Sequence, residues 1–413
     1  MTAAVSSNPA SRNPVIFVLL TVLIDTIGFG IIMPVSPQLI MEIAGVELAD
    51  AARLGGHLLV VFAALQFLSG PILGNLSDRY GRRPVLLVSL IAFSLNYALM
   101  GFAQSLTWLF IGRALTGIAG AVYAPASAYV ADVTPPDKRA ANFGLIGAMF
   151  GLGFIVGPAL GGLLGKFGPR APFFAAAGLA ALNFLYGVIV LPESLPKERQ
   201  RAFDIRRANP LGTLVSLRSA PHVLGFALVA FVWQLAFHVY PATWSFFAIA
   251  KFQLEPLEIG GTLALSGISM TVVQGFLTGR IVARIGEKRT APIGFLVGAT
   301  AFLAYAFMTQ KWMLYPVLAL GGMQSVAMPS LNALMSRALG PERQGELSGA
   351  MASIMGLSSI IGPYVLTQTM AYYSSPSAPL YFPGAAFVLA SLCALLCLLL
   401  FELQLRRVAR AQS

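Results

Sequence analysis

The stretch Gly74-Asn75-Leu76-Ser77-Asp78-Arg79-Tyr80-Gly81-Arg82-Arg83-Pro84 decides the fold, because a degenerate copy of it returns 205 residues later. That copy reads Gly279-Arg280-Ile281-Val282-Ala283-Arg284-Ile285-Gly286-Glu287-Lys288-Arg289. Each copy is a charged turn between two apolar segments of membrane length. The same offset relates Gly144, Gly151 and Gly157-Pro158 to Gly349, Gly356 and Gly362-Pro363. We therefore interpret the chain as two related halves.

The composition is typical of a polytopic membrane protein. The 413 residues are 57% hydrophobic and only 10% charged, whereas an ordinary soluble domain is about 25% charged. Reading between charged or Pro/Gly-rich breaks gives twelve apolar segments, each long enough to span a bilayer. They are expected to begin near Pro14, Gly56, Pro84, Thr107, Ala140, Ala171, Pro221, Glu258, Thr290, Trp312, Glu346 and Leu380. The prediction is an all-α membrane protein with twelve transmembrane helices in two pseudo-symmetric six-helix bundles.

The distribution of basic residues predicts the orientation. An even number of spans puts both termini on one side, and almost all of the 27 Lys and Arg residues then fall on that side too. The exceptions are Arg113, which lies within a span, and Arg53, Lys166, Arg170, Lys251 and Lys311 on the opposite side. Positively charged loops stay cytoplasmic, so both termini are expected in the cytoplasm. The net charge of +11 therefore lies mainly on short cytoplasmic loops, where it orients the helices and contacts anionic lipid head groups. A nucleic-acid partner is not needed to explain it.

One long polar break divides the chain. It predicts a first bundle over 1–191, a cytoplasmic linker over 192–218 and a second bundle over 219–413. We interpret the linker as a solvated tether with some amphipathic helix, the alternative being a binding domain. The repeat keeps the same orientation in both halves, as expected for parallel repeats about an axis along the membrane normal.

These features resemble the major facilitator superfamily over nearly the whole chain. The segment 74–84 resembles the signature of the loop between helices 2 and 3 of that superfamily. Segments 23–34, 112–117 and 151–162 resemble the first-, fourth- and fifth-helix motifs of its twelve-span drug/proton antiporters. The turn 78–87 and the segment Pro241-Ala242-Thr243 are most similar to bacterial tetracycline/proton antiporters of the Tet type. The resemblance implies alternating access, with a proton as coupling ion and no cofactor.

Two ionisable residues inside spans are candidates for proton coupling. Asp25 is the only acid well inside a span, where a charged carboxylate costs about 2.5 to 3.5 kcal/mol on insertion scales. It must be protonated, paired or hydrated, and it can serve either as a coupling carboxylate or as a packing acid bonded through Thr26. Arg113 also needs a partner. It is expected either near Asp25, tuning its protonation as the family resemblance implies, or bonded to carbonyls between helices.

The first loop motif predicts a conformational latch formed by Gly74, Asp78, Arg79, Gly81, Arg82, Arg83 and Asp132. The glycines allow close helix approach and a tight turn, Asp78 can cap a helix, and the arginines can pair with acids. The resemblance implies Asp132, at the end of the fourth helix, as the partner acid. The alternative is that the charges only fix topology. Because Ala283 and Glu287 replace the acid and the first arginine, the second copy is expected to act mainly as a basic topology anchor.

Small residues follow one face of the fifth predicted helix. Gly153, Gly157, Pro158 and Gly161 have the spacing of a close helix contact. The resemblance implies that this helix packs against the eighth across the interface between halves and resists leak.

The substrate cavity is expected to use the scarce polar and aromatic residues inside spans, whose alternative role is helix-to-helix hydrogen bonding. These residues are Gln66, Asn96, Tyr97, Tyr123, Gln234, His238, Trp244, Gln274, Gln324 and Asn332. Tet-type antiporters carry an acid, a histidine and another acid where this chain has Asn96, Met270 and Gly298. The more neutral cavity predicts lipophilic or amphipathic substrates and argues against a dedicated exporter of the tetracycline chelate.

The sequence predicts proton-coupled efflux of small organic compounds by a monomeric protein of the inner membrane. The alternatives are proton-coupled uptake of a metabolite, which the glycine-rich fifth helix disfavours, and transport of a lipid-like substrate. Three histidines and two cysteines, Cys393 and Cys397, form no metal-ligand pattern, and no nucleophile has a nearby base. An enzyme is therefore not expected.

Overall fold

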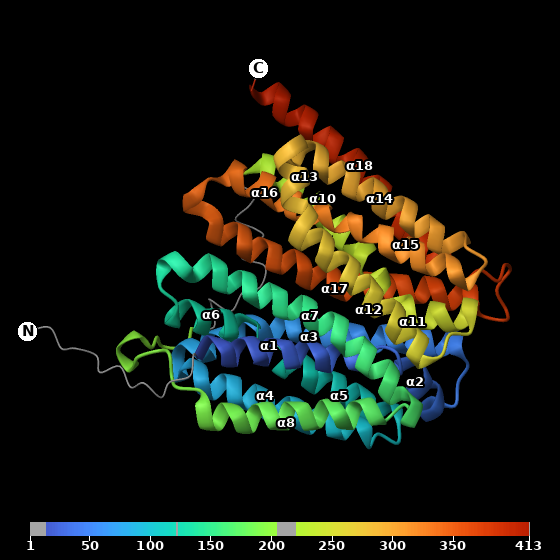
Figure 1. The fold of residues 1–413 in the computed structure, drawn as a ribbon, viewed down its shortest axis with the longest axis horizontal. Coiled ribbons are helices and arrows are strands. Elements are labelled where there is room, and N and C mark those ends of the chain that lie inside the picture. The colour runs from blue at the N-terminus through green and yellow to red at the C-terminus, as the bar shows by residue number, and fades with distance from the viewer. Residues whose placement is uncertain (1–13, 121–122, 205–219, 413) are drawn as a thin grey trace, which may run out of the picture.

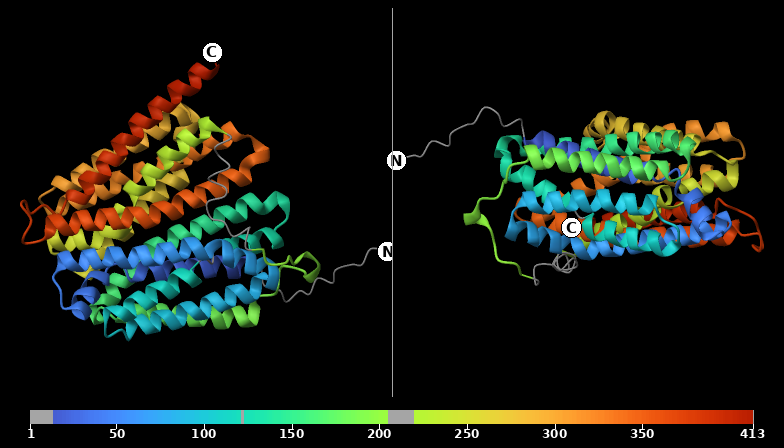
Figure 2. Two further views of the ribbon diagram at one scale, coloured as in Figure 1. Left: turned by 180° about the vertical axis from the view of Figure 1, so that it is seen from behind. Right: turned by 90° about the horizontal axis from the view of Figure 1, so that it is seen from below.

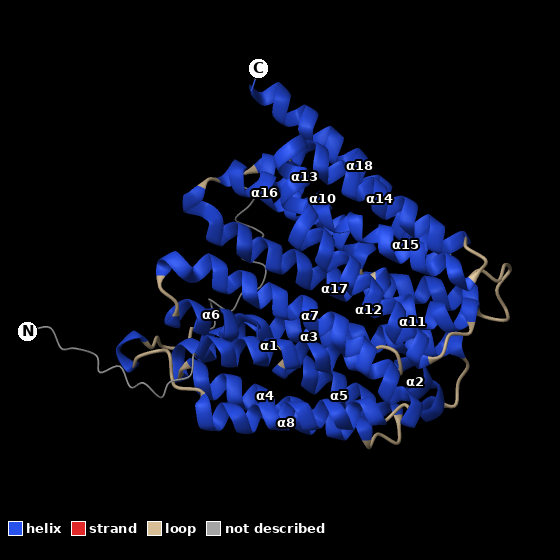
Figure 3. Cartoon of the chain, viewed as in Figure 1, coloured by secondary structure: helices blue, strands red, loops and turns tan. Residues whose placement is uncertain are grey.

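The structure is a computed structural model that describes residues 14–120, 123–204 and 220–412. Within these ranges the chain is helical, and no strand occurs among them (Figure 3). The first group of helices is α1 (Pro14–Ile31), α2 (Ser36–Ala44), α3 (Leu48–Tyr80), α4 (Arg82–Gly101), α5 (Leu106–Ala119), α6 (Tyr123–Val133), α7 (Arg139–Leu164) and α8 (Ala171–Val190).

The second group follows the linker. It consists of α10 (Pro221–Phe237), α11 (Val239–Phe252), α12 (Pro256–Val272), α13 (Thr278–Ile285), α14 (Glu287–Phe307), α15 (Leu314–Gly321), α16 (Ala327–Leu339), α17 (Gln344–Ser374) and α18 (Ala385–Gln412). A π-helical turn, Val273–Leu277, joins α12 to α13. A 3₁₀ turn, Gly322–Val326, joins α15 to α16.

The predicted all-α membrane architecture is confirmed, whereas the count of twelve spans stays a prediction. Among the described residues, 10 helices are long and apolar enough to cross a membrane, or up to 11 if α1 and α2, bent by 52°, form one span. The short apolar helix α5 is followed by residues 121–122, which lie outside the described ranges. A continuous fourth span is therefore neither shown nor contradicted.

Two predicted helix starts were wrong by more than a turn. The second span begins at Leu48 instead of near Gly56, and an ion pair of 3.1 Å between Arg53 and Asp50 lies in its extra turns. The last helix begins at Ala385 instead of near Leu380. Three prolines between residues 375 and 384 explain the delay, because proline lacks the N–H that a helix interior needs.

The duplication predicted from the sequence is visible in the backbone. The turns between α3 and α4 and between α13 and α14 each contain a glycine with positive φ, Gly81 at 102° and Gly286 at 75°. These residues are separated by the same offset as the two loop motifs, as are the first residues of α7 and α17. Glycine adopts this backbone conformation without a steric penalty, so each copy of the motif needs its last glycine.

The two groups of helices meet along two seams, α3 against α17 and α7 against α12. Figure 1 shows α1 to α8 below and α10 to α18 above, and both figures show the groups diverging toward one end (Figures 1 and 2). We call the end with the turns at Gly81 and Gly286 the motif face. We call the opposite end, with the turns at Gly45 and Gly168, the far face.

Contacts along the α3 seam weaken from the far face to the motif face. Near the far face, Gly56 abuts Thr367, and a Cβ on Gly55 would lie 2.8 Å from the Phe246 ring. Toward the motif face, Gly74 of α3 and Gly345 of α17 would place a Cβ in open space. The α3 seam is therefore closed at the far face and open at the motif face.

The α7 seam has the same gradient. Near the far face, a Cβ on Gly162 would lie 2.5 Å from the carbonyl oxygen of Pro256, whereas at mid-depth a Cβ on Gly151 would lie 3.4 Å from Thr271. On the motif side, Gly144 and Gly147 would meet no atom within 4 Å. The hydroxyl of Ser245 also donates to the carbonyl oxygen of Met33 at 2.9 Å near the far face. The conformation is open toward the motif face.

Candidate functional site

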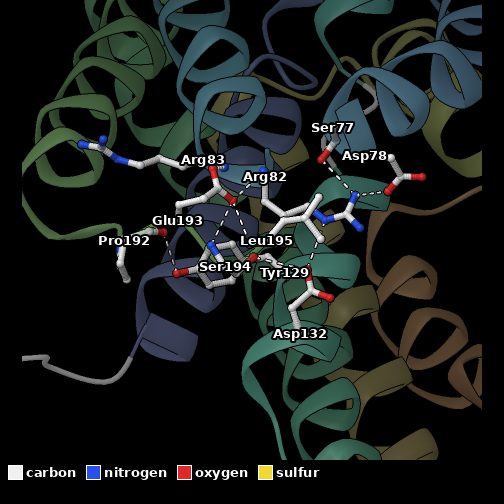
Figure 4. A network of polar contacts seen from close by, with 10 residues as sticks. All are labelled: Ser77, Asp78, Arg82, Arg83, Tyr129, Asp132, Pro192, Glu193, Ser194 and Leu195. Carbon is white, nitrogen blue, oxygen red and sulfur yellow. Dashed lines mark hydrogen bonds and ion pairs between the residues drawn. The ribbon is translucent and has the colours of Figure 1, made fainter. Parts of the chain in front are cut away.

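The guanidinium of Arg82 joins the motif-face ends of three helices. Its Nη1 lies 2.6 Å from Asp78 Oδ1 on α3, and its Nε lies 3.2 Å from Asp132 Oδ2 on α6. Nη1 also donates to the Ser77 hydroxyl at 3.2 Å (Figure 4). The Arg82 side chain is only 11% exposed, so these charge-assisted bonds are partly shielded from water. The contacts expected among Asp78, Arg82 and Asp132 are present, and their role as a latch stays a prediction.

The start of α4 is capped by an acid from a distant part of the chain. The carboxylate of Glu193 accepts the backbone N–H of Arg82 at 2.8 Å and that of Arg83 at 3.2 Å. The next residue, Pro84, has no N–H, and Gly81 already donates to the carbonyl of Ser77. Glu193 therefore satisfies every free donor in the first turn of α4, where a negative charge also complements the helix dipole.

The segment 192–204, which we call the strap, is bound to the latch residues. The Tyr129 hydroxyl donates to the Pro192 carbonyl at 3.0 Å, and the Ser194 hydroxyl donates to Asp132 at 3.3 Å. At the other end, Asn75 and the backbone of Asp204 exchange two hydrogen bonds of 2.6 and 3.4 Å. The expectation of a solvated tether is wrong for these residues, because side chains of α3 and α6 and backbone N–H groups of α4 bind them. The rest of the predicted linker, 205–218, lies outside the described residues.

The second loop motif contains a charge-reversed copy of the Arg82 to Asp132 pair. Adding the repeat offset to Arg82 and Asp132 gives Glu287 and Arg337, and these residues form an ion pair of 2.6 Å. Glu287 begins α14 and its side chain is 10% exposed, whereas Arg337 lies in the last turn of α16 and is 72% exposed. The acid of this copy therefore joins α14 to α16, and the expected role of the copy as mainly a topology anchor stays a prediction.

Asp25 lies on α1, half-buried, and no described residue forms an ion pair or hydrogen bond with it. The hydroxyl of Thr26 donates instead to the carbonyl oxygen of Val22 at 2.7 Å. The alternative of a packing acid bonded through Thr26 is thus not what the structure contains.

Arg113 on α5 is buried, with 8% of its surface exposed, and its Nε has no hydrogen-bond partner among the described residues. It does not form an ion pair with Asp25. Tyr97 lies within electrostatic range of both, and its ring lies against α1 near Gly28. Asp25 and Arg113 thus both influence one buried tyrosine, without an ion pair between them in this conformation.

The glycine run of α7 contacts two different helices. Gly153, Gly157 and Gly161 face α1 within the same group: a Cβ on Gly157 would lie 2.9 Å from the carbonyl oxygen of Ile27. The carbonyl of Pro158 abuts Gly260 of α12, whereas its ring lies against Gly30 of α1. The expected packing of this helix against the eighth span, α12, is present, but the three glycines of the motif contact α1. Their four-residue spacing puts them on one face, and Pro158 and Gly162 lie on the next.

A cavity of about 60 Å³ lies between the two groups near the far face. Arg113 is its only charged lining residue, and Ser36 and Ser245 are polar. The remaining lining residues are apolar and come from both groups: Phe29, Ile32, Met33, Leu39, Ile40, Gly55, Leu58, Leu59, Met100, Leu109, Phe173, Pro241, Ala242 and Phe246. Typical small-molecule sites occupy about 300 to 1,000 Å³, so this cavity is only part of a drug-sized site. Of these residues, the sequence drew attention to Arg113, to the 241–242 segment and, within the first-helix motif 23–34, to Phe29, Ile32 and Met33.

The nine predicted cavity residues whose side chains are described do not line this small cavity, and their contact with substrate stays a prediction. Asn96 donates to the Thr116 hydroxyl, Trp244 donates to Thr262 at 2.9 Å, and Gln324 donates to the Tyr240 hydroxyl at 2.8 Å. Gln66 donates to the carbonyl of Gly120 at 3.1 Å. Tyr97 is buried, Gln234 and His238 are half-buried, and Gln274 and Asn332 are exposed. The side chain of Tyr123 lies outside the described residues.

The hydrogen bonds of Gln66, Asn96, Trp244 and Gln324 have one physical reason. A polar side chain inside a membrane helix needs a partner, and neighbouring helices supply it before a cavity does. Trp244 is also packed among Tyr240, Phe247, Tyr305 and Phe387 in an aromatic core. At Gly298, the Trp233 ring would lie 2.5 Å from an added Cβ. The Trp233 ring therefore fills the space beside Gly298. The side chain of Met270 is half-buried.

A duplicated helical membrane protein with a cavity between its halves, closed at one face and open at the other, has the architecture of an alternating-access transporter. The family comparison agrees. The sequence model of the Major Facilitator Superfamily matches residues 18–363, and the chain belongs to this superfamily.

The relatives extend over nearly the whole chain. The tetracycline resistance protein, class C, of Escherichia coli is 39% identical over 388 residues, covering 94% of this chain and 96% of that protein. Multidrug resistance protein 2 of Bacillus subtilis (strain 168) is 29% identical, covering 86% and 88%. Among solved structures, the human organic anion transporter MFSD10 (TETRAN) aligns with a TM-score of 0.70 at 27% identity, covering 95% of this chain and all of that one. The expected similarity to Tet-type proteins is confirmed.

Proposed function

We propose that the protein exports small lipophilic or amphipathic organic compounds in exchange for protons, by alternating access. The observation that carries this proposal is the gradient along both seams, closed at the far face and open at the motif face. Rocking one group of helices against the other about these seams would open the far face and expose a central site to the other side. Relatives named for tetracycline and multidrug resistance support export as the direction.

The motif face is assigned to the cytoplasm. Basic residues of the described loops and helix ends gather at this face, including Arg79, Arg83, Arg284 and Arg343, as the positive-inside rule requires of a cytoplasmic surface. Both termini are then cytoplasmic, and the chain divides into bundles over 1–191 and 219–413 with a linker over 192–218. In this orientation the conformation described above is open to the cytoplasm.

Asp25 is proposed as the proton carrier. It is half-buried with no described partner, and both it and Arg113 lie within electrostatic range of Tyr97. A small approach of α1 toward α5 would let the two charges interact and favour release of the proton from Asp25. Movement of α1 away from α5 would favour reprotonation of Asp25, because a lone carboxylate inside a membrane is costly when charged.

The apolar cavity lining supports a lipophilic substrate class. One cation, two serines and many aliphatic and aromatic groups offer few ligands for a metal chelate, and the positions corresponding to Tet-type acids hold Asn96 and Gly298. We therefore propose broad, Tet-like efflux without a dedicated tetracycline-chelate site. No cofactor beyond the coupling proton is invoked.

The decisive experiment screens organic compounds by thermal shift at two pH values, followed by transport in proteoliposomes with an imposed proton gradient. We expect hits whose stabilisation depends on pH in the wild type and loses that dependence in Asp25→Asn. Asp50→Asn is the matched control, because this acid is exposed and pairs with Arg53 on the surface. Export would be refuted by a panel that yields no transport and an Asp25→Asn protein identical to wild type. A deletion strain that loses growth on one nutrient without gaining drug sensitivity would indicate uptake.

A further inference from the structure

We propose that the hydroxyl of Ser245 is a switch that connects occupancy of the cavity with opening of the far face. The inference rests on the proposed export by alternating access, and it names a contact that the substrate breaks. In the closed far face the hydroxyl binds the opposite group of helices, and a bound substrate with a hydrogen-bond acceptor replaces that partner. The substrate class is thereby narrowed to apolar compounds that carry an acceptor.

Proline at position 37 leaves the carbonyl oxygen of Met33 without its helical donor. The neighbouring residues keep the regular spacing, since the N–H of Ser36 donates to the carbonyl oxygen of Ile32 at 2.9 Å. The equivalent donor for Met33 would be residue 37, and proline has no N–H. Met33 is buried, and a buried carbonyl oxygen without a partner is costly. This oxygen therefore needs a donor from another part of the fold.

The other group of helices supplies that donor. The hydroxyl of Ser245 on α11 donates to the carbonyl oxygen of Met33 at 2.9 Å, at the bend of 52° between α1 and α2. Ser245 is only 8% exposed. The next residue, Phe246, packs against Gly55 of α3, where an added Cβ would lie 2.8 Å from its ring. The bond thus crosses between the two groups and must break when they separate at the far face.

Ser245 has a second acceptor on its own helix. Serine and threonine hydroxyls in helices often donate to the carbonyl oxygen four residues earlier, as Thr243 does to Val239 at 2.6 Å. For Ser245 this acceptor is the carbonyl oxygen of Pro241. Rotation about one side-chain bond moves the hydroxyl from Met33 to Pro241. Water can then hydrate the Met33 carbonyl at the opened face, so neither state leaves a buried polar group unpaired.

The switch lies in the wall of the cavity. Met33, Pro241 and Ser245 all line it. The hydroxyl of the other lining serine, Ser36, donates within its own segment. Among the described lining residues, Ser245 alone donates a side-chain hydrogen bond to the opposite group. A compound in the cavity that offers an oxygen acceptor competes with Met33 for this hydroxyl and so removes a polar contact that holds the far face closed. A hydrocarbon of the same shape does not.

The test uses one buried cysteine as a reporter of far-face opening. Thr367 of α17 is fully buried and abuts Gly56 of α3 across the closed part of the seam. A bulky maleimide reaches Thr367→Cys only when the seam separates there. The background is Cys393→Ala with Cys397→Ala, and the protein is held in lipid nanodiscs. At low reagent concentration the labelling rate follows the fraction of molecules that are open at the far face.

Ser245→Ala should raise the labelling rate about threefold to tenfold, the factor that corresponds to one neutral hydrogen bond. The reason is that the Met33 carbonyl then lacks a partner only in the closed state. Thr243→Val is the matched control and should label at the wild-type rate, because its hydroxyl bonds within α11. Equal labelling rates of Ser245→Ala and Thr243→Val would overturn the proposal.

A second background separates the switch from a general loss of packing. Pro37→Ala gives the Met33 carbonyl a donor in its own helix. In this background Ser245→Ala should change the labelling rate by less than about twofold, because the two substitutions act on the same carbonyl oxygen and are not additive. An effect of Ser245→Ala that is equally large with proline or alanine at position 37 would contradict the role of Met33.

Two ligands of matched shape test the link to the cavity. Acetophenone and ethylbenzene differ mainly in one carbonyl oxygen, and both are added at the same millimolar concentration. Acetophenone should raise the labelling rate at least about twofold above ethylbenzene, and Ser245→Ala should abolish this difference. Equal rates with the two compounds in protein that keeps Ser245 would overturn the ligand step. Neither a proton gradient nor transport is involved, so failure of the proteoliposome assay would refute export without affecting these results.

Discussion

Replacing Gly162 by alanine tests whether the α7 to α12 seam is the tight contact on which alternating access depends. A Cβ at this position would meet only backbone atoms: the Pro256 carbonyl oxygen at 2.5 Å, the Leu257 Cα at 3.0 Å and the Gly260 Cα at 3.2 Å. Ordinary contacts begin at 3.4 Å, so α7 and α12 must separate by about 1 Å. No side-chain rotation can relieve the clash, because all three neighbours are main-chain atoms.

The expected cost follows from two opposing terms. Overpacking a tight contact costs about 1 to 3 kcal/mol, whereas alanine in place of glycine in a helix gains about 1 kcal/mol. Gly162→Ala should therefore be neutral to about 2 kcal/mol less stable than wild type. Gly261→Ala on α12 isolates the helix term, because a Cβ there meets no atom within 4 Å. This control should be more stable than wild type by up to about 1 kcal/mol.

Two measurements on the purified pair of variants decide the matter. Thermal unfolding in detergent should give a lower midpoint for Gly162→Ala than for Gly261→Ala. Proton leak in proteoliposomes without substrate should rise only for Gly162→Ala, because its added methyl group separates α7 from α12 near the far face. Equal midpoints together with equal leak would refute the assignment of this seam as a close backbone contact.

Three further variants test other contacts. Tyr240→Phe should lower stability by about 1 to 3 kcal/mol, because it leaves the buried Gln324 amide without its 2.8 Å partner. Thermal unfolding measures this loss, and the double variant Tyr240→Phe with Gln324→Leu should recover most of it. Glu287→Lys should impair folding more than Arg337→Ala, since the acid is buried and the arginine exposed, with yield of monodisperse protein as the measure. Gly81→Ala should be more destabilising than either, because a φ of 102° and the nearby carboxylate both exclude a side chain; a midpoint within a degree of wild type would contradict this.

Local and periodic features of the fold could be predicted from the sequence. Apolar segments bounded by charges gave the helices, since each span must satisfy its own backbone in lipid. The repeat offset gave the duplication. The motif supplied Asp78 as an acid near Arg82, which a guanidinium at a helix end can pair with, and the family resemblance supplied Asp132.

The tertiary contacts of individual side chains could not be predicted, because they leave no periodic pattern in the sequence. Glu193 follows a helix and precedes a polar stretch, so nothing in its neighbourhood distinguishes it from the solvated acid Glu198. Asn96 and Gln324 look like cavity residues because they are polar, yet each is bonded to a neighbouring helix. Which helix would receive the glycine face of α7 was equally open, since close packing on α1 and on α12 requires the same residues.

The charge reversal between the two loop motifs bears on how the halves sort themselves as the chain folds. Two repeated bundles offer nearly equivalent docking positions, so α4 could pack beside α16 as readily as beside α6. That exchange would bring Arg82 against Arg337 and Glu287 against Asp132, two repulsions in place of two ion pairs. Had both copies kept one polarity, the exchanged arrangement would carry the same ion pairs as the native one. The reversed charges thus favour pairing of each helix within its own half and disfavour pairing with the equivalent helix of the other half.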